Sequence, residues 1–165
     1  MIRIATTADI DEVMEILKAT VKFMHGYGND QWDELYPSRE DVLCDINRGE
    51  LFVGVRGSVI AGFICLNNNE PLEYQNLQWS KSSSAVVVHR MAVSQKFMRQ
   101  GVASELMNYA DVLAAQQNNY LKTDTYSLNV YAQGLFAKFG YTRIGTMNYR
   151  GKQLKFFCYE KILKK

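Results

Sequence analysis

The spacing of apolar side chains changes along the chain, and each spacing predicts an element. Residues 2–5 alternate between apolar and polar positions, as in a short strand. Residues 10–24 carry apolar side chains at intervals of three and four, which indicates an amphipathic helix. Thr7 or Asp9 is placed to cap the start of this helix, and it should end near Gly26 or the next glycine.

A second helix and a hairpin follow an irregular segment rich in aromatic and acidic residues. Ser38 is an N-cap residue, and Asp41 three positions later makes a partial capping box, which predicts a helix start. Residues 51–55 and 59–66 are then rich in apolar and β-branched side chains, as buried strands are. The turn sequence at 56–58 predicts that these two strands form a hairpin.

The segment from residue 85 to residue 115 organises the rest of the chain. Residues 85–93 are apolar except for His89 and Arg90, a pattern that predicts a buried strand. A polar turn at 94–100 separates this strand from a helix that begins at residues 101–104. Such a unit directs free backbone N–H groups and the positive end of a helix dipole at one spot, where an anion can bind.

The pattern of the C-terminal part predicts further strands and one helix. We expect, in order, a strand at 120–125, a helix at 130–139 closed by Gly140, and a final hairpin of strands 142–149 and 154–162. Residues 67–84 show no clean period, and a long irregular segment of this kind covers a site or is mobile. The pattern predicts one mixed α/β domain over residues 1–165, with a largely antiparallel sheet.

Composition narrows the classes of function. A chain of 165 residues suits one domain, and a net charge of +2 does not suggest a nucleic-acid binder. The first residues do not resemble a signal peptide, and no segment approaches the length that spans a bilayer. Cys44, Cys65 and Cys158 each lie in an apolar pattern, so we expect buried free thiols rather than a disulfide or metal site. The expected location is the cytoplasm.

The phrase HRMAVSQKFMRQGVASELM, at residues 89–107, resembles motif A of the GNAT family of acetyl-CoA-dependent N-acetyltransferases. The family pattern is Arg/Gln-x-x-Gly-x-Gly/Ala after a strand. Gly101 and Ala103 match its two small positions, whereas Met98 stands where Arg or Gln is usual. The departure removes one side-chain contact, but backbone amides do not depend on the side chain.

A second block, from Asn129 to Tyr141, is similar to motif B of the same family, Asn-x-x-Ala-x-x-Leu-Tyr-x-Lys-x-Gly-Phe. Helical spacing places Asn129, Ala132 and Phe136 on one face, which in the family lies along the pantetheine arm of the cofactor. The alternative is that Ala132, Leu135 and Phe136 are core residues, and for Leu135 we adopt it. Phe136 also replaces the tyrosine that often protonates the leaving thiolate. The front half of the chain resembles bacterial GNAT proteins of unassigned substrate.

The resemblance implies the GNAT fold, an α/β (α+β) architecture whose mixed, mostly antiparallel central sheet has helices on both faces. It also implies a splay between strands 4 and 5, here residues 85–93 and 120–125, into which acetyl-CoA enters as cosubstrate. The N–H of Val93 would stabilise the oxyanion as an amine attacks the thioester. The implied cofactor-binding residues are Met91, Ala92, Val93, Met98, Arg99, Gln100, Gly101, Val102, Ala103, Ser104, Asn129, Ala132 and Phe136.

The candidate general base is His89, which interrupts an apolar strand and shares a face with Val93. Its alternative role is that of a buried, hydrogen-bonded structural histidine. Arg90 faces the other way and should pair with an acid across the sheet. Tyr126 is the candidate general acid, with Tyr131 as a substitute, and no metal is expected.

The candidate substrate-binding residues are Trp32, Tyr36 and Glu73, because aromatic rings and carboxylates suit a cationic amine. Each can equally be a core anchor or a solvated acid. The acceptor would be a small-molecule amine or a peptide N-terminus, with no nucleic acid or membrane as partner, and the protein a monomer or homodimer. Two other functions stay open: a non-catalytic CoA-binding sensor or partner protein of the same fold, and an unrelated α/β nucleotide or phosphate binder.

Overall fold

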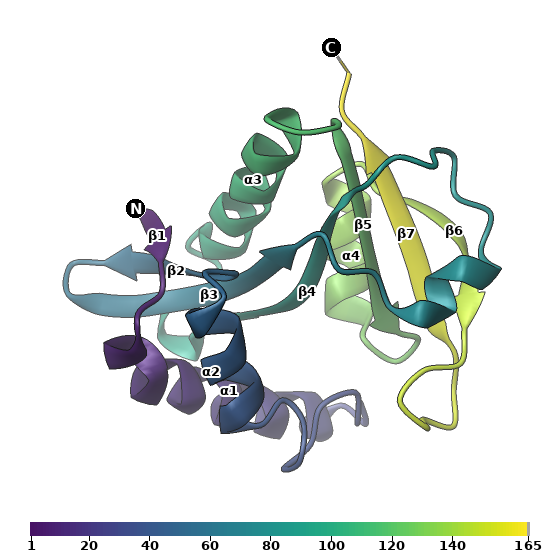
Figure 1. The fold of residues 1–165 in the computed structure, drawn as a ribbon. Helices are drawn as coiled ribbons and strands as arrows, with labels where there is room; N and C mark the ends of the chain where they lie inside the picture. Colours follow the sequence, from purple (N-terminus) through teal and green to yellow (C-terminus); the bar gives the residue numbers. More distant parts are fainter. Residues whose placement is uncertain (165) are drawn as a thin grey trace. The chain divides into compact units, whose positions relative to one another are not determined.

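The computed structural model describes residues 1–164 and contains the elements expected from the sequence. The helices are α1 (Ile10–Gly26), α2 (Arg39–Asn47), α3 (Val102–Ala115) and α4 (Val130–Lys138), with short 3₁₀ turns η1 (Thr7–Asp9), η2 (Leu72–Asn76) and η3 (Gln95–Phe97). The strands are β1 (Ile2–Ile4), β2 (Leu51–Arg56), β3 (Val59–Asn67), β4 (Val86–Val93), β5 (Tyr120–Tyr126), β6 (Thr142–Met147) and β7 (Phe156–Ile162) (Figure 1). None of the described helices is both long and apolar enough to cross a bilayer.

The strands form a sheet in the order β1-β2-β3-β4-β5-β7-β6. The pairs β1/β2, β2/β3, β5/β7 and β6/β7 are antiparallel, whereas β4 and β5 run parallel. This confirms the expected mixed, mostly antiparallel sheet. The chain divides into two compact units, the first made of residues 1–66 and 89–109 and the second of residues 67–88 and the described residues from 110 onward.

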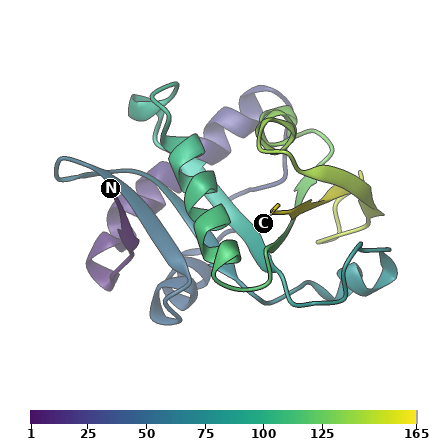
Figure 2. The ribbon, with the colours of Figure 1, turned by 90° about the horizontal axis from the view of Figure 1, so that it is seen from above.

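In the first unit, alternate residues of β2 face opposite layers of helix. Val53 points into a core built with residues of α1 and α2. The opposite face carries Phe52 and Gly54. The ring centroid of Phe52 lies 5.0 Å from that of Tyr109 in α3, and a Cβ added to Gly54 would lie 3.7 Å from the side chain of Leu106. Helices therefore cover both faces of these strands, as Figures 1 and 2 show.

In the second unit, the two faces of the β5–β7 pair also have different covers. Phe136 of α4 packs on one face, with its ring centroid 5.3 Å from that of Tyr159. On the other face, Tyr74 of η2 belongs to a buried cluster with Tyr126 and Cys158. The irregular segment 67–84 thus packs on the sheet, and the expectation that it covers a site stays a prediction.

This segment is anchored to the sheet by polar contacts at three places. The Nζ of Lys122 donates to Glu70 at 2.7 Å, and the Tyr74 hydroxyl donates to Asp124 at 2.7 Å. The amide of Ser80 donates to Glu160 at 3.0 Å. Because all three contacts fall on one face of β5 and β7, they fix the path of a segment that has little regular structure.

Strands β4 and β5 pair over only part of their length. Val86–Val88 pair with Leu121–Thr123, and the remainder of β4, from His89, belongs to the first unit. The pairing thus ends at Val88 and Thr123, within the two strands for which the family resemblance implies a splay.

Local capping signals were predicted correctly at the start of α2 and at the glycines that end α1 and α4. The Ser38 side chain accepts from the amide of Asp41, and the Asp41 carboxylate accepts from the amide of Ser38, which completes the capping box. At the start of α1 the prediction was wrong, because Asp9 occupies the N-cap position without a side-chain capping bond and Thr7 lies within η1.

One expectation about the cysteines was wrong: Cys44 is exposed, whereas Cys65 and Cys158 are buried, and all three thiols are free. Val42 and Ile46 define the buried face of α2. Cys44 lies two positions from each of them, so its side chain points away from that face.

Candidate active site

The turn between β4 and α3 combines an exposed glycine with unusual backbone angles. Arg99 has a φ of 60° and Gly101 a φ of 82°, both in the left-handed region. Nothing lies within 4 Å of the position that a Cβ on Gly101 would take. A non-glycine residue held in this conformation is a strain that proteins keep mainly at functional sites.

Backbone amides at this turn precede the hydrogen-bonded part of α3. Glu105 makes the first such bond, from its amide to the carbonyl of Gly101 at 3.0 Å. The amides of Gly101, Val102 and Ala103 lie ahead of it, where helix geometry provides no intrahelical acceptor. The amide of Gln100 instead donates to the carbonyl of Phe97 at 3.3 Å. The open space and the unsatisfied donors fit a phosphate group.

The direction of the backbone amides of β4 follows from its contact with β3. The amide of Ser94 donates to the carbonyl of Ala61 in β3 at 2.8 Å. Because successive amides of a strand point to opposite edges, the N–H groups of Val93 and Met91, one and three residues before Ser94, both point the other way. The Val93 N–H therefore points away from β3, toward the edge of β4 that is available for an added strand.

Glycine allows β3 and β4 to approach closely beside this edge. A Cβ on Gly62 would lie 2.8 Å from the carbonyl oxygen of Ala92 and 3.3 Å from the Cα of Val93. Only a residue without a side chain fits there, so Gly62 sets the position of the strand end that carries Val93.

Arg90 forms a buried ion pair, which confirms that it faces an acid. Its Nε donates to Asp45 Oδ2 at 2.9 Å and its Nη2 to Asp45 Oδ1 at 2.6 Å. Its Nη1 donates to the Tyr36 hydroxyl at 2.8 Å. His89 directly precedes Arg90 on the strand, so its side chain lies on the opposite face. It is partly exposed.

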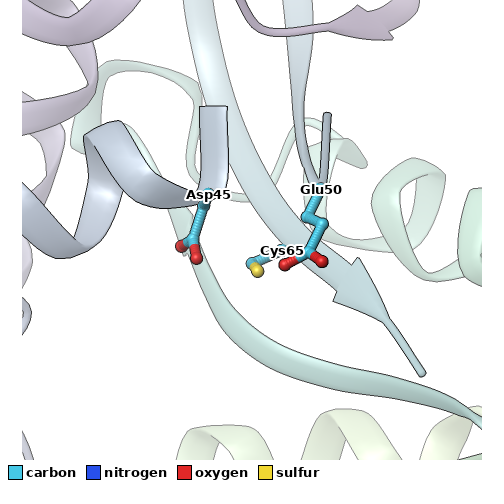
Figure 3. Close-up of side chains that lie close together, drawn as sticks. All are labelled: Asp45, Glu50 and Cys65. Atoms are coloured by element: carbon cyan, nitrogen blue, oxygen red, sulfur yellow. The ribbon is translucent and has the colours of Figure 1, made fainter. Parts of the chain in front are cut away.

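Asp45, Glu50 and Cys65 point toward one another beside this ion pair, and one atom of each lies within 4.8 Å of the others (Figure 3). Carboxylates and thiolates can bind a metal. Both oxygens of Asp45, however, already accept hydrogen bonds from the Arg90 guanidinium. Burial raises the pKa of the Cys65 thiol well above its usual range, so the sulfur stays protonated. We therefore assign the cluster to the ion pair.

The expected substrate-binding residues of the first unit differ in exposure. Trp32 is only 6% exposed and belongs to the core cluster, while its carbonyl contacts the Nε2 of His25 at 2.9 Å. This favours the core-anchor alternative for Trp32. Tyr36 is partly exposed, with its hydroxyl engaged by Arg90.

The second unit carries the remaining expected site residues. Asn129 is the N-cap of α4, and its side chain accepts from the amide of Ala132 at 3.1 Å. Phe136 is 6% exposed among aromatic rings, which favours the core alternative for it. The Tyr126 ring is 2% exposed and its hydroxyl accepts from the amide of Leu154 at 3.2 Å. Tyr131 is 58% exposed.

The sequence points to Tyr74 as one of the aromatic residues in the irregular segments expected to flank the acceptor groove, but it does not single out the partner of Tyr74, Asp124. Asp124 of β5 and Tyr74 of the irregular segment share a 2.7 Å hydrogen bond, and Tyr74 is only 1% exposed. The sequence feature that could have identified Asp124 is its position as an acidic residue on an otherwise buried strand, where carboxylates are rare. Glu73, an expected substrate-binding residue, precedes Tyr74 directly.

Comparison with known proteins identifies relatives over most of the chain. Residues 12–141 match the sequence profile of the Acetyltransferase (GNAT) family. The uncharacterized N-acetyltransferase YesJ of Bacillus subtilis is 21% identical over 146 residues, which cover 86% of this chain and 81% of that protein.

Solved structures agree with this match. An acetyltransferase of the GNAT family from Streptococcus agalactiae has a TM-score of 0.87 and 26% identity, and the alignment covers 100% of this chain and 96% of that one. A protein from Staphylococcus aureus Mu50 has a TM-score of 0.78 and 31% identity, with 99% of each chain covered. Ard1 from Thermoplasma volcanium, with 20% identity and a TM-score of 0.75, covers 100% of this chain and 98% of its own, and shares the fold.

Proposed function

Because this chain belongs to the Acetyltransferase (GNAT) family, we propose that it transfers an acetyl group from acetyl-CoA to a primary amine by direct attack in a ternary complex. The observation that carries the proposal is the β4–α3 turn, with its left-handed Arg99 and Gly101 and its unsatisfied helix amides. Bound acetyl-CoA supplies an activated thioester. The chain's own residues bind, orient and polarise the reactants.

The proposed phosphate seat is the turn from Met98 to Ser104. The amides of Gly101, Val102 and Ala103 and the positive end of the α3 dipole attract the pyrophosphate. The side chain of Arg99 and the neighbouring Lys96 are exposed and add positive charge. Met98 is 42% exposed and has no charge to contribute.

The proposed partner of the pantetheine arm is the edge of β4 that faces away from β3. Backbone groups of Met91 and Val93 along this edge can pair with the arm as an added strand does. The Val93 N–H then donates to the thioester oxygen as negative charge develops on it. Ala92 keeps its backbone directed to β3 and holds the edge in place. Asn129, Ala132 and Phe136 are proposed for the same cofactor by the family resemblance alone.

His89 is the proposed general base. As the amine nitrogen forms its bond to the carbonyl carbon, the C–S bond breaks and His89 accepts the proton that the nitrogen loses. The CoA sulfur leaves as a thiolate, which is stable enough near neutral pH to part without an acid. Tyr126 is the proposed general acid for a mechanism in which the leaving thiolate is protonated. Its hydroxyl oxygen accepts from the amide of Leu154, so this bond does not use the hydroxyl hydrogen. Holding amine and thioester together accounts for much of the acceleration.

The second candidate is a non-catalytic CoA-binding protein of the same fold. Met98 and Phe136 favour it, since both stand where the family pattern carries a functional side chain. A thiol-release assay with acetyl-CoA over a panel of primary amines separates the two. Release that depends on both amine and enzyme supports acetyl transfer. CoA binding by calorimetry with no release on any amine class would favour the non-catalytic protein.

A further inference from the structure

Asp124 stands at the point of β5 where pairing with β4 ends. The residue before it, Thr123, forms the last pair between β5 and β4, opposite Val88. The Oγ1 of Thr123 donates to the Val88 carbonyl at 2.9 Å. Asp124 therefore follows directly on the last pair of the parallel ladder.

The Asp124 carboxylate is held by a rigid neutral donor. Its Oδ2 accepts from the hydroxyl of Tyr74 at 2.7 Å. The carbonyl of Tyr74 accepts in turn from the Nε1 of Trp79 at 2.8 Å, and the two ring centroids lie 4.8 Å apart. The buried tyrosine is thus held through its hydroxyl, its backbone carbonyl and its ring contact with Trp79, and its hydroxyl orients the carboxylate.

Within the described chain, Asp124 accepts this one hydrogen bond and forms no salt bridge. Its neighbours on the same face are paired. Lys122 lies 2.7 Å from Glu70, and Glu160 accepts from Ser80 and Tyr120. A partly buried carboxylate with no cation in direct contact is costly, and proteins normally pair such groups. Asp124 thus offers one oxygen to a cation from outside the chain.

Two charged side chains act on Asp124: Glu73 of η2 is a like charge, and Arg150 of the β6–β7 turn is an opposite charge. Cys158 is its partner on β7, and burial raises the pKa of this thiol to about 12, so it is neutral. Burial, opposed by the Tyr74 hydrogen bond, raises the pKa of Asp124 to about 6. The carboxylate is therefore charged at neutral pH and becomes neutral in mild acid.

We propose that Asp124, oriented by Tyr74, binds the ammonium group of the acceptor, so that the acceptor is a primary amine that arrives as a cation. The inference rests on the proposed function in taking this amine to be the acetyl acceptor: the ammonium first gives up one proton to water, and His89 accepts the second as the C–N bond forms and the C–S bond breaks. An ammonium supplies the missing charge and an N–H donor for the free carboxylate oxygen. An uncharged hydroxyl compound of the same shape lacks that charge and should bind more weakly.

The test compares binding of amines and of matching alcohols in the presence of CoA. The probes are 2-phenylethylamine and 1,4-diaminobutane, with 2-phenylethanol and 1,4-butanediol as their uncharged counterparts. Carboxyl resonances of ¹³C-labelled aspartate report the contact, and the Asp124 signal is identified by its loss in Asp124→Asn. We expect an amine, but not its alcohol, to move that signal, and its dissociation constant to rise at least about tenfold in Asp124→Asn.

Asp11→Asn is the matched control, because Asp11 is exposed on α1 and pairs with Arg39. It should leave amine binding unchanged. The inference is overturned if neither amine moves the Asp124 signal, if the alcohols bind as well as the amines, or if Asp124→Asn binds amine within twofold of the parent.

Two further readouts separate binding from a structural role. Asn keeps an acceptor for Tyr74 and removes the unpaired charge, so Asp124→Asn should unfold at a higher temperature than the parent at pH 7.5. A lower unfolding temperature would indicate a structural carboxylate. In the parent, amine binding should weaken as pH falls through about 6, where Asp124 takes up a proton. Tyr74→Phe removes a bond that lowers this pKa, so the loss should move to higher pH.

The thiol-release assay keeps this inference distinct from the proposed function. If amines bind through Asp124 and no thiol is released, the acetyl-transfer proposal fails and the amine site stands. If thiol is released and Asp124→Asn keeps the parent's KM for the amine, the transfer proposal stands and the amine site fails.

Discussion

At the scale of single residues, Gly101 has two properties that a phosphate seat requires. Its φ of 82° is one that glycine adopts without strain, and the space beside its Cα is open. Any side chain there would project into that space. The same two properties make the residue a sharp probe of where the cofactor binds.

Replacing Gly101 with Glu should abolish CoA affinity. A negative side chain would enter the phosphate seat, so we expect CoA binding by calorimetry to weaken about 100-fold or more. The matched control is Gly57→Glu in the β2–β3 turn, where φ is 59° and the space is equally open. Both variants carry the same backbone strain of about 1–2 kcal/mol. Equal CoA affinity in the two variants would mean that the phosphate seat lies elsewhere.

His89 is tested by its removal. His89→Ala should lower kcat by about 100-fold at neutral pH and leave CoA affinity intact, because a general base typically contributes this much. The chain has one other histidine, His25, which is exposed and serves as the control. A rate within threefold of the parent in His89→Ala would exclude it as the base.

At the scale of elements, α4 begins with a side-chain cap that is also part of the second family motif. Asn129 accepts from the amide of Ala132, so it has a structural task whether or not it contacts the cofactor. If Asn129 acts as a cap, its loss lowers the free energy of unfolding. If it only contacts the cofactor, its loss leaves that free energy unchanged.

Asn129→Ala should lower the free energy of unfolding by about 1 kcal/mol, as loss of an N-cap does. For a chain of this size the unfolding temperature should fall by about 2–4 °C. Asn108→Ala, at an exposed position within α3, is the control and should not destabilise the protein. A stable Asn129→Ala that binds CoA more weakly would show that the residue acts on the ligand rather than as a cap.

Elements built from neighbouring residues were predictable from the sequence, whereas contacts between distant residues were not. The capping box of Ser38 and Asp41 and the glycine at the end of α4 depend on spacing within a few positions. The path of residues 67–84 depends on bonds such as that of Tyr74 to Asp124, which are 50 positions apart. No local period carries that information.

At the scale of the whole molecule, the same distinction applies to the candidate site. The positions of Gly101 and Val93 follow from a strand–turn–helix pattern, and the fold agrees with it. That Arg90 pairs with an acid was predictable from its side of the strand, but its partner Asp45 lies 45 positions earlier. Trp32 shows the limit of composition, because an aromatic residue in a loop can be a core anchor as readily as a binding residue.

The account depends on backbone amides at the β4–α3 turn binding the pyrophosphate of CoA. Amide NMR of the ¹⁵N-labelled protein titrated with CoA reports on every described residue at once. We predict that the largest shifts fall on Arg99–Ser104, with Met91 and Val93 also affected, and that Gly57 and its turn stay unchanged. Saturable CoA binding that leaves the amides of Arg99–Ser104 unmoved would contradict the account.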